Sequence, residues 1–594
     1  MIPILRGFRL ALVLGAALAA HDARAQSLPV ARANAFGGYD FWSASASGPA
    51  TQVASFAVFL PVELAGASFR DRLRCDRPIG AGQGSPAPHI RLPGGGSLFL
   101  TFATQGATLH HVDGSGVLHA ALVGQNIAPS SPGGGLLSQV AVSPDGRRAL
   151  AASTTDNEGE VVLLDLASGG APAVLTAALP PLIVAGASLR VSSRRAFFVA
   201  SGKLYRADLT AAGAAGQAAL VPLGLPDTHV VLPELLLSAD GGSLALVSEA
   251  PGGLRQVHVV RPDGSVQLAS DAPAPIDAPA LQSPLGPLLA ISADGAVVAW
   301  RASVAGSHEV FLQAVPPAPL SPPVQLTAVA SFADTLDDAG LLGFAPGGLL
   351  TFVVGQAQAG ALGGADLFTA ELVPGGAALH NATATSGLTA PPFLVPGELS
   401  IAAAVLDPLG ERLLLTLDPA QGGDAALLAI PADGSGAGSL PLPPFAQPPV
   451  LARAGHDVLL QSVPASAPAG GTELHLLAPL GAPGPAALPI GTAPPGVLLD
   501  RITDAANGSR VALVAHGAAP AVQLPLTIDI ASGAVLPAWT QLFQVSPLLA
   551  LPPSGALVAG VGNPGGPYLF IAFTGFNAGT VLKLPAGFGF PLPF

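Results

Sequence analysis

The chain has 594 residues, of which 50% are hydrophobic, 10% charged and 5% aromatic, and its formal net charge is −13 at pH 7. Disordered chains are poor in apolar residues, so this composition excludes general disorder. Nucleic-acid binding needs a basic patch, and the arginines here cluster only in pairs such as Arg147-Arg148, so we expect no nucleic-acid partner. The 73 glycines and 61 prolines break up helix-length windows and favour short strands joined by turns.

Residues 1–25 have the pattern of a secretory signal peptide. Arg6 and Arg9 precede an uncharged apolar run at 10–20, and the Ala-Arg-Ala sequence at 23–25 fits a signal-peptidase site. The apolar run is shorter than the ~20 residues that span a bilayer. We therefore expect cleavage near Gln26, a periplasmic or extracellular (secreted) protein, and no membrane span after cleavage. An uncleaved membrane anchor is the alternative.

Residues 26–88 form an N-terminal segment that lacks the repeat described below. Within it, residues 53–64 (VASFAVFLPVEL) are predicted to supply a strand that closes the last blade of a ring against the first. The segment also holds Cys75, the only cysteine, which cannot form an intramolecular disulfide and is expected to be a small buried residue.

From residue 89 to the end of the chain, one fifteen-residue pattern recurs: an apolar strand, a tight turn such as Ser-Pro-Asp-Gly, and a second apolar strand. Glycine occupies the same turn position in eight of the ten copies, because it closes such a turn without steric conflict. The copies lie at 89–103, 139–153, 187–201, 234–248, 288–302, 341–355, 403–417, 449–463, 501–515 and 548–562.

A second hairpin follows most of these copies, at 161–175, 204–220, 257–269, 367–379, 427–440 and 526–536. Two hairpins make four strands, which is one blade of a β-propeller, and the spacing of the copies is typical of such blades. The predicted fold is all-β: a β-propeller of about ten four-stranded blades in residues 89–594, as one large ring or two smaller propellers. Residues 381–398 are the expected hinge if there are two.

Residues 140–169, which contain VAVSPDGRRALAAS and EVVLLDLASG, resemble the blade signature of a bacterial propeller superfamily that includes TolB-like, YVTN-type and lactonase-like (WD40-like) repeats. This resemblance implies a propeller architecture in an exported bacterial repeat protein. It implies little about activity, because one fold hosts many functions.

No Gly-x-Ser-x-Gly elbow, phosphate-binding loop or His-Glu-x-x-His motif occurs, so the sequence assigns no catalytic, cofactor-binding or metal-binding residue and predicts no cofactor. The strongest metal lead is the hairpin at 109–119, whose turn at 113–116 would place His110 near His119 on one face. A third ligand is lacking, so we interpret this segment as an exposed outer hairpin.

Two groups of acidic residues are interpreted as solvated turns, because neither has the regular ligand spacing of a calcium loop. They are Asp334, Asp337 and Asp338, and Asp156, Glu158 and Glu160. The aspartates of the repeated turns are interpreted as turn residues, because a single site does not need copies. These are Asp145, Asp240 and Asp294.

The sequence therefore favours an exported, non-catalytic binding or scaffold module for an unknown protein, peptide or glycan, since propeller loops present a broad surface. The alternative is a lactonase- or lyase-like propeller enzyme whose catalytic residues converge from separate blades in the central funnel and leave no local motif.

Overall fold

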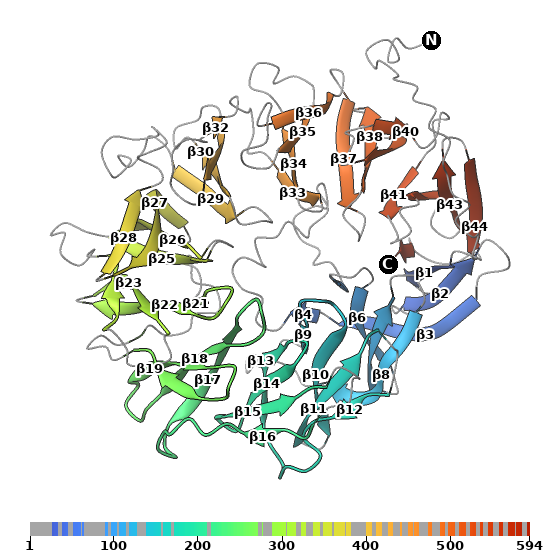
Figure 1. Cartoon of the computed structure of the whole chain (residues 1–594). Helices are drawn as coiled ribbons and strands as arrows, with labels where there is room; N and C mark the ends of the chain where they lie inside the picture. The colour runs from blue at the N-terminus through green and yellow to red at the C-terminus, as the bar shows by residue number, and fades with distance from the viewer. Residues whose placement is uncertain are drawn as a thin grey trace.

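Every regular element that the computed structural model describes is a β-strand. The described residues are 27–33, 39–45, 51–60, 62–64, 89–92, 97–103, 106–113, 118–127, 138–155, 158–167, 171–210, 216–270, 276, 288–304, 306–315, 322–327, 337–344, 348–358, 361–374 and 376–381, followed by strands β29 to β45. Their sheets follow one another in chain order around a ring, with the blue N-terminal strands beside the red C-terminal ones (Figure 1).

Eight sheets have four antiparallel strands each, in simple chain order. Four of them comprise β13 (Val184–Val191), β14 (Arg195–Ala200), β15 (Lys203–Asp208) and β16 (Ala219–Leu220); β17 (Val230–Leu237), β18 (Leu244–Glu249), β19 (Arg255–Val260) and β20 (Val266–Leu268); β21 (Leu289–Ile291), β22 (Val297–Val304), β23 (Ser307–Ala314) and β24 (Val324–Gln325); and β25 (Asp337–Phe344), β26 (Leu350–Gln358), β27 (Ala361–Val373) and β28 (Gly376–Asn381).

The other four complete the C-terminal half of the ring. They comprise β29 (Ser400–Leu406), β30 (Arg412–Asp418), β31 (Ala426–Pro431) and β32 (Leu440–Pro441); β33 (Val450–Ala454), β34 (Asp457–Ser462), β35 (Glu473–Leu477) and β36 (Ala487–Thr492); β37 (Val497–Asp504), β38 (Arg510–Gly517), β39 (Gln523–Asp529) and β40 (Val535–Pro537); and β41 (Val545–Ala550), β42 (Leu557–Val561), β43 (Tyr568–Gly575) and β44 (Ala578–Leu584). The first strand lies nearer the ring centre than the fourth, as β33 and β36, and β29 and β32, show (Figure 1).

The remaining thirteen strands are linked into one larger sheet made of three four-stranded groups and β4. The groups are β45–β1–β2–β3, β5–β6–β7–β8 and β9–β10–β11–β12; additional pairings of β3 with β6, β8 with β10 and β4 with β9 connect them. The bounds are β1 (Ser27–Ala33), β2 (Tyr39–Ser45), β3 (Thr51–Leu60), β4 (Val62–Leu64), β5 (His89–Arg91), β6 (Ser97–Ala103), β7 (Gly106–Val112), β8 (Leu118–Ile127), β9 (Ser138–Val142), β10 (Arg148–Thr155), β11 (Glu158–Asp165), β12 (Ala173–Val174) and β45 (Pro591–Pro593).

Strand β1 joins the two ends of the chain by pairing antiparallel with β45. Val30 lies opposite Pro593, and Ala31 lies opposite Leu592. The N-terminal segment thus meets the C-terminal strand through β1. Residues 53–64 form β3 and β4: β3 pairs with β2 of the same group and with β6, and β4 pairs with β9.

All ten predicted copies of the first hairpin are present, as β5–β6, β9–β10, β13–β14, β17–β18, β21–β22, β25–β26, β29–β30, β33–β34, β37–β38 and β41–β42. The six predicted second hairpins are also present, as β11–β12, β15–β16, β19–β20, β27–β28, β31–β32 and β39–β40. The prediction of repeated four-stranded antiparallel units is confirmed.

Hydrogen bonds of one serine and one aspartate hold the turn between the first and second strands, which we call the first turn of a sheet. In β21–β22, Ser292 Oγ donates to Asp294 Oδ1 over 2.6 Å and accepts from the Val297 amide over 2.9 Å, while Asp294 Oδ1 accepts from the Ala296 amide over 3.0 Å. The pairs Ser143–Asp145 and Ser238–Asp240 repeat this arrangement. The interpretation of the three repeated aspartates as turn residues is confirmed.

The first-turn glycines adopt left-handed backbone conformations, which glycine tolerates best. The φ angles of Gly146, Gly241 and Gly295 are 69°, 69° and 70°. A Cβ added to Gly241 would lie 2.5 Å from Ser192 Cβ in the preceding sheet, so this turn packs directly on its neighbour.

Hydrophobic clusters lie between successive sheets. One cluster joins Phe198 of β14 to Leu150 and Leu163 of the preceding sheet, and another joins Phe197, on the other face of β14, to Leu235 and Leu246 of the following sheet. The sheet β13–β16 is thus covered on both faces, which explains why its strands are rich in apolar residues.

Several sequence-based predictions concern residues outside the described ranges. These are the signal peptide at 1–25, Cys75 and the proposed hinge beyond Asn381. Among the residues that are described, no helix has the length and apolar character needed to cross a bilayer.

Candidate functional site

The histidine hairpin forms as predicted, but with a different pairing, and its strand β7 is buried at Leu109, His110 and His111, so the interpretation of an exposed hairpin was wrong. Strands β7 and β8 place His111, not His110, opposite His119, and His110 lies opposite Ala120. The prediction was wrong because the connecting turn spans residues 113–117 instead of 113–116, and a one-residue change in register moves side chains to the other face.

The two buried histidines of this hairpin lie in environments that disfavour charge. His110 stacks on Phe99 with a centroid separation of 4.8 Å, and burial lowers the pKa of His110 to about 4. Burial, and secondarily the proximity of His119, lowers the pKa of His111. His119 is exposed, and its Nε2 lies 2.9 Å from Asp113 Oδ2. In the described part of the chain, no group of three potential ligands is arranged to hold a metal ion.

The sequence analysis interpreted both acidic groups as turns, but the structure places some of their residues in strands. Glu158 and Glu160 belong to β11, and Asp337 and Asp338 begin β25. Asp156 and Asp334 fall outside the described residues. Neither group is therefore one continuous loop.

A serine–histidine pair in the sheet β17–β20 was not anticipated from the sequence. Ser248 Oγ of β18 lies 2.9 Å from His258 Nε2 of β19, which is the separation of a nucleophile and its base. Both residues are nearly inaccessible, at 1% and 3% exposure, and burial lowers the pKa of His258 to about 4, with His229 lowering it further. The pair stabilises the interior of the sheet and does not offer a nucleophile to a substrate.

The first and third turns of every sheet lie at the same end, because the first and third strands run parallel in an antiparallel meander. On this turn face, arginines connect one sheet to the next. Arg148 of β10 donates through Nη1 to Ser193 O over 2.8 Å and through Nη2 to Thr210 O over 2.5 Å. Arg195, at the matching position of β14, donates to the backbone oxygens of Gly242, Arg261 and Pro262.

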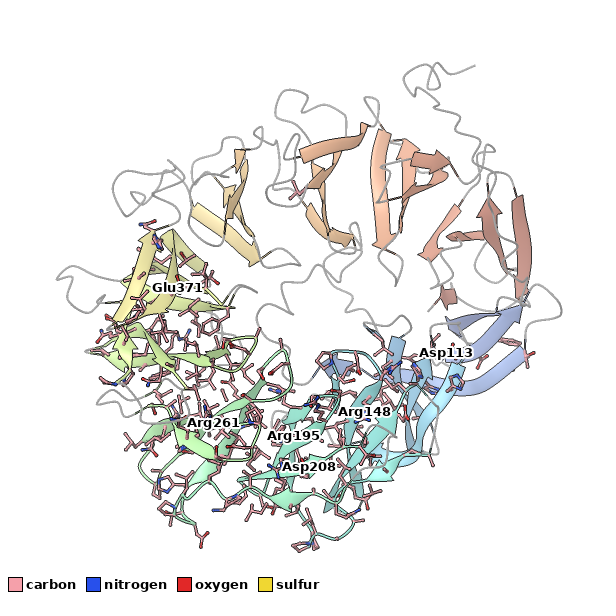
Figure 2. The ribbon with its side chains drawn as sticks, viewed as in Figure 1. Asp113, Arg148, Arg195, Asp208, Arg261 and Glu371 are labelled. Carbon is pink, nitrogen blue, oxygen red and sulfur yellow. The ribbon has the colours of Figure 1, made fainter. Side chains whose placement is uncertain are left out.

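Arg261 continues the series by donating through Nη2 to Val315 O of the next sheet over 2.9 Å. Arg148, Arg195 and Arg261 therefore lie in successive sheets along the lower arc of the ring (Figure 2). Guanidinium groups suit this role because their planar donors can reach several carbonyl oxygens at once.

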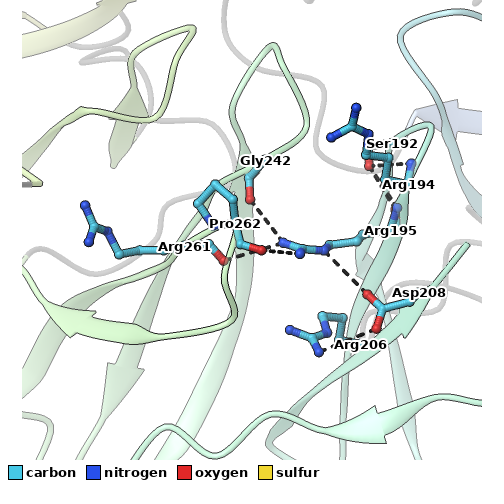
Figure 3. A network of polar contacts seen from close by, with 8 residues as sticks. All are labelled: Ser192, Arg194, Arg195, Arg206, Asp208, Gly242, Arg261 and Pro262. Carbon is cyan, nitrogen blue, oxygen red and sulfur yellow. Dashed lines mark hydrogen bonds and ion pairs between the residues drawn. The ribbon is translucent and has the colours of Figure 1, made fainter. Parts of the chain in front are cut away.

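The candidate site is an arginine cluster on the turn face of sheet β13–β16: Arg194, Arg195 and Arg206 with Asp208. Asp208 is 66% exposed, and its two oxygens lie 3.5 Å from Arg195 Nε and 3.5 Å from Arg206 Nη2. Figure 3 shows Arg194 and Arg206 on opposite sides of Arg195, whose guanidinium points to the neighbouring sheet. Arg194 is exposed, and within the described residues its side chain makes no hydrogen bond or ion pair.

A shortened first turn creates this cluster. Ser192 Oγ accepts hydrogen bonds from the Arg194 and Arg195 amides over 3.2 and 3.0 Å. The Ser192 amide donates to Arg195 O, three residues later in the chain. In the preceding sheet, the Ser143 amide donates to Arg148 O, five residues later. The shorter turn therefore lacks the aspartate that its neighbours carry as Asp145, Asp240 and Asp294.

The sequence contained a signal for this site that motif searches overlook. The repeat copy at 187–201 reads SSRR where another reads SPDGRR, so an aspartate and a glycine are missing beside two arginines. The deletion alone does not reveal the cluster, because Arg206 is brought to the two arginines only by the pairing of β14 with β15.

No family model matches this chain, and no curated protein matches its sequence. Among solved structures, dipeptidyl peptidase 4 of Porphyromonas gingivalis is similar with a TM-score of 0.36 and 11% identity over 89% of this chain and 62% of its own. A prolyl endopeptidase has a TM-score of 0.31 and 11% identity over 66% of this chain and 55% of its own. TolB of Acinetobacter baumannii has a TM-score of 0.22 and 13% identity over 58% and 76%.

The structural similarity to these peptidases and to TolB is distant. The matches span little more than half of the prolyl endopeptidase chain and less than two thirds of the dipeptidyl peptidase chain. At these TM-scores and identities, the similarity supports no inference about activity, substrate or partner.

Proposed function

We propose that this chain is an exported β-propeller of about ten four-stranded blades that acts as a binding or scaffold module for protein, peptide or glycan, and not as an enzyme. The ring of sheets in Figure 1 supports the propeller assignment. The sequence repeat accounts for ten blades, and the group β45–β1–β2–β3 would add one more. The pattern at residues 1–25 supports export to the periplasm or the exterior.

The observation that carries the binding proposal is the arginine cluster on the turn face. Asp208 is 66% exposed and Arg206 is 29% exposed, so both present charge to solvent, while Arg195 beside them is anchored to backbone oxygens of the neighbouring sheet. Charged groups held by a rigid scaffold suit recognition, because little side-chain entropy is lost when a partner binds. The buried Ser248–His258 pair, in contrast, offers no access to a substrate.

An array experiment tests this proposal. The labelled full chain would be applied to arrayed decapeptides and oligosaccharides, with a soluble protein of equal net charge as a control, and the same preparation would be assayed against a panel of lactones and polyuronates. We expect saturable retention on a subset of ligands and no turnover. Turnover of any substrate without retention on the arrays would overturn the proposal and favour the lactonase- or lyase-like alternative.

A further inference from the structure

We propose that the arginine cluster binds an acidic peptide, with one carboxylate on Arg206 in place of Asp208 and a second on Arg194. This inference rests on the binding function proposed above and names the chemistry of the partner. Four features of the cluster support it.

The first observation is that Asp208 makes only long ion pairs with Arg195 and Arg206. Both of its ion pairs measure 3.5 Å, whereas a full charge-assisted hydrogen bond measures about 2.7–2.9 Å. The same sheet ring contains such a bond: Arg255 Nε lies 2.7 Å from Glu249 Oε2. Arg206 therefore keeps donor capacity for an incoming carboxylate that aligns better than Asp208 does.

The second observation is that Arg206 is held in place from behind. A Cβ on Gly264 would lie 2.8 Å from Arg206 Nη1, so the guanidinium rests against bare backbone in the neighbouring sheet. Gly264 has φ of 87° and belongs to the third turn of that sheet. A guanidinium supported in this way loses little freedom on binding a ligand.

The third observation concerns local charge. Among the four first turns described between β9 and β22, three contain an aspartate, and only the Ser192 turn contains an arginine and no acid. The third-turn segment of the same sheet, residues 209–218, has no charged residue. The sheet β13–β16 thus presents a positive surface in a chain whose net charge is −13, which concentrates an anionic ligand there.

The fourth observation is the placement of the two available arginines. Arg194 and Arg206 lie on opposite sides of Arg195 (Figure 3). An extended chain with several carboxylates offers one group to each of the two arginines. Arg206 already holds a carboxylate, that of Asp208, which favours glutamate or aspartate side chains over sulfate groups.

The test uses the full chain and fluorescein-labelled deca-glutamate, with deca-glutamine as the neutral probe, in a fluorescence anisotropy titration at low ionic strength. We expect deca-glutamate alone to bind. The double variant Arg194→Gln/Arg206→Gln should weaken binding by roughly tenfold or more. Arg147→Gln removes an arginine that is also exposed, from the adjacent sheet, where Asp145 is retained, and should leave the affinity unchanged within about twofold.

Asp208→Asn provides a readout that a merely destabilised protein would not give. It removes the internal competitor of the peptide and should tighten deca-glutamate binding. Weaker or unchanged binding by this variant would overturn the assignment, as would absence of deca-glutamate binding. Stronger competition by a heparin-derived hexasaccharide than by unlabelled deca-glutamate would assign the site to a sulfated glycan instead.

The failure of this inference can be distinguished from failure of the proposed function. If arrayed ligands are retained equally by the parent chain and by Arg194→Gln/Arg206→Gln, the chain is a binding module whose partner docks elsewhere. If nothing is retained on the arrays and turnover is found, the binding function itself falls.

Discussion

The guanidinium of Arg148 donates from Nη1 to the carbonyl oxygen of Ser193 over 2.8 Å, and this bond crosses from one four-stranded group to the next. Its second bond, to Thr210 O, reaches the third turn of the same neighbour. Arg148 is only 8% exposed, so solvent cannot replace these partners when they are lost. Sheets in this ring are therefore joined by directed polar bonds as well as by apolar packing.

We predict that Arg148→Lys destabilises the chain by about 1.5–3 kcal/mol, because lysine lacks the planar fork that reaches both carbonyl oxygens. The midpoint of urea unfolding would report the change. Arg147→Lys is the matched control, since Arg147 is the preceding residue and is exposed. Equal shifts in the two variants would show that the bonds between sheets contribute nothing measurable.

We predict that Ser292→Ala costs about 1–3 kcal/mol, because it leaves the half-buried amide of Val297 without its side-chain acceptor and removes one of the two donors to Asp294 Oδ1. Ser193→Ala should be nearly neutral, since Ser193 is exposed and contributes only its backbone oxygen to Arg148. Thermal unfolding followed by circular dichroism would compare them. A neutral Ser292→Ala would mean that the turn network is not needed for stability.

Two glycine substitutions separate backbone strain from steric overlap. Gly295 and Gly306 both have positive φ, but an added Cβ would overlap Ser243 at Gly295 and would meet nothing within 4 Å at Gly306. Both alanine variants carry roughly 1–2 kcal/mol of backbone strain, and Gly295→Ala adds about 1–3 kcal/mol for the forced repacking. Similar unfolding midpoints for the two variants would contradict the close contact between neighbouring turns.

Acid should destabilise the chain through its buried histidines. Burial lowers the pKa values of His110 and His258 to about 4, whereas the unfolded value is 6.5, so between these values the unfolded chain binds protons that the folded chain does not. The contribution of these neutral histidines to the free energy of unfolding is therefore fully present above pH 6.5 and is lost as the pH falls toward 4. From pH 7 to pH 5 the loss is about 2 kcal/mol for each histidine.

His258→Gln should remove one of these two contributions, although it lowers stability at pH 7 by disturbing the bond to Ser248. Urea unfolding at pH 7 and pH 5 gives the difference for the parent chain and the variant. An identical pH difference in both proteins would mean that His258 does not titrate on unfolding.

The repeated hairpins could be predicted because their information is local. In the turn around Asp294, serine, aspartate and glycine satisfy one another within six residues, so the sequence pattern and the structure coincide. The strands of sheet β13–β16 are covered on both faces, so they are recognised as apolar runs and not by alternation of apolar and polar residues.

Features that depend on distant pairing could not be predicted in the same way. The partner of His119 changed from His110 to His111 through one additional turn residue, which no composition signal marks. The closing pair of Ala31 with Leu592 lies outside the repeat, and β45, the strand that contains Leu592, is only three residues long. The arginine cluster likewise required knowledge of which strand places Arg206 beside Asp208.

The most direct test of the closed ring is a cysteine cross-link between its two ends. In a Cys75→Ser background, Ala31→Cys and Leu592→Cys would be combined, since these residues are directly paired in β1 and β45. Val30→Cys with Leu592→Cys is the control, because adjacent strand residues face opposite sides. Closure predicts an intramolecular disulfide in the first pair, seen as faster migration on a non-reducing gel that dithiothreitol reverses, and little in the control. No disulfide in the paired variant, or equal disulfide in both, would contradict a ring closed by its termini.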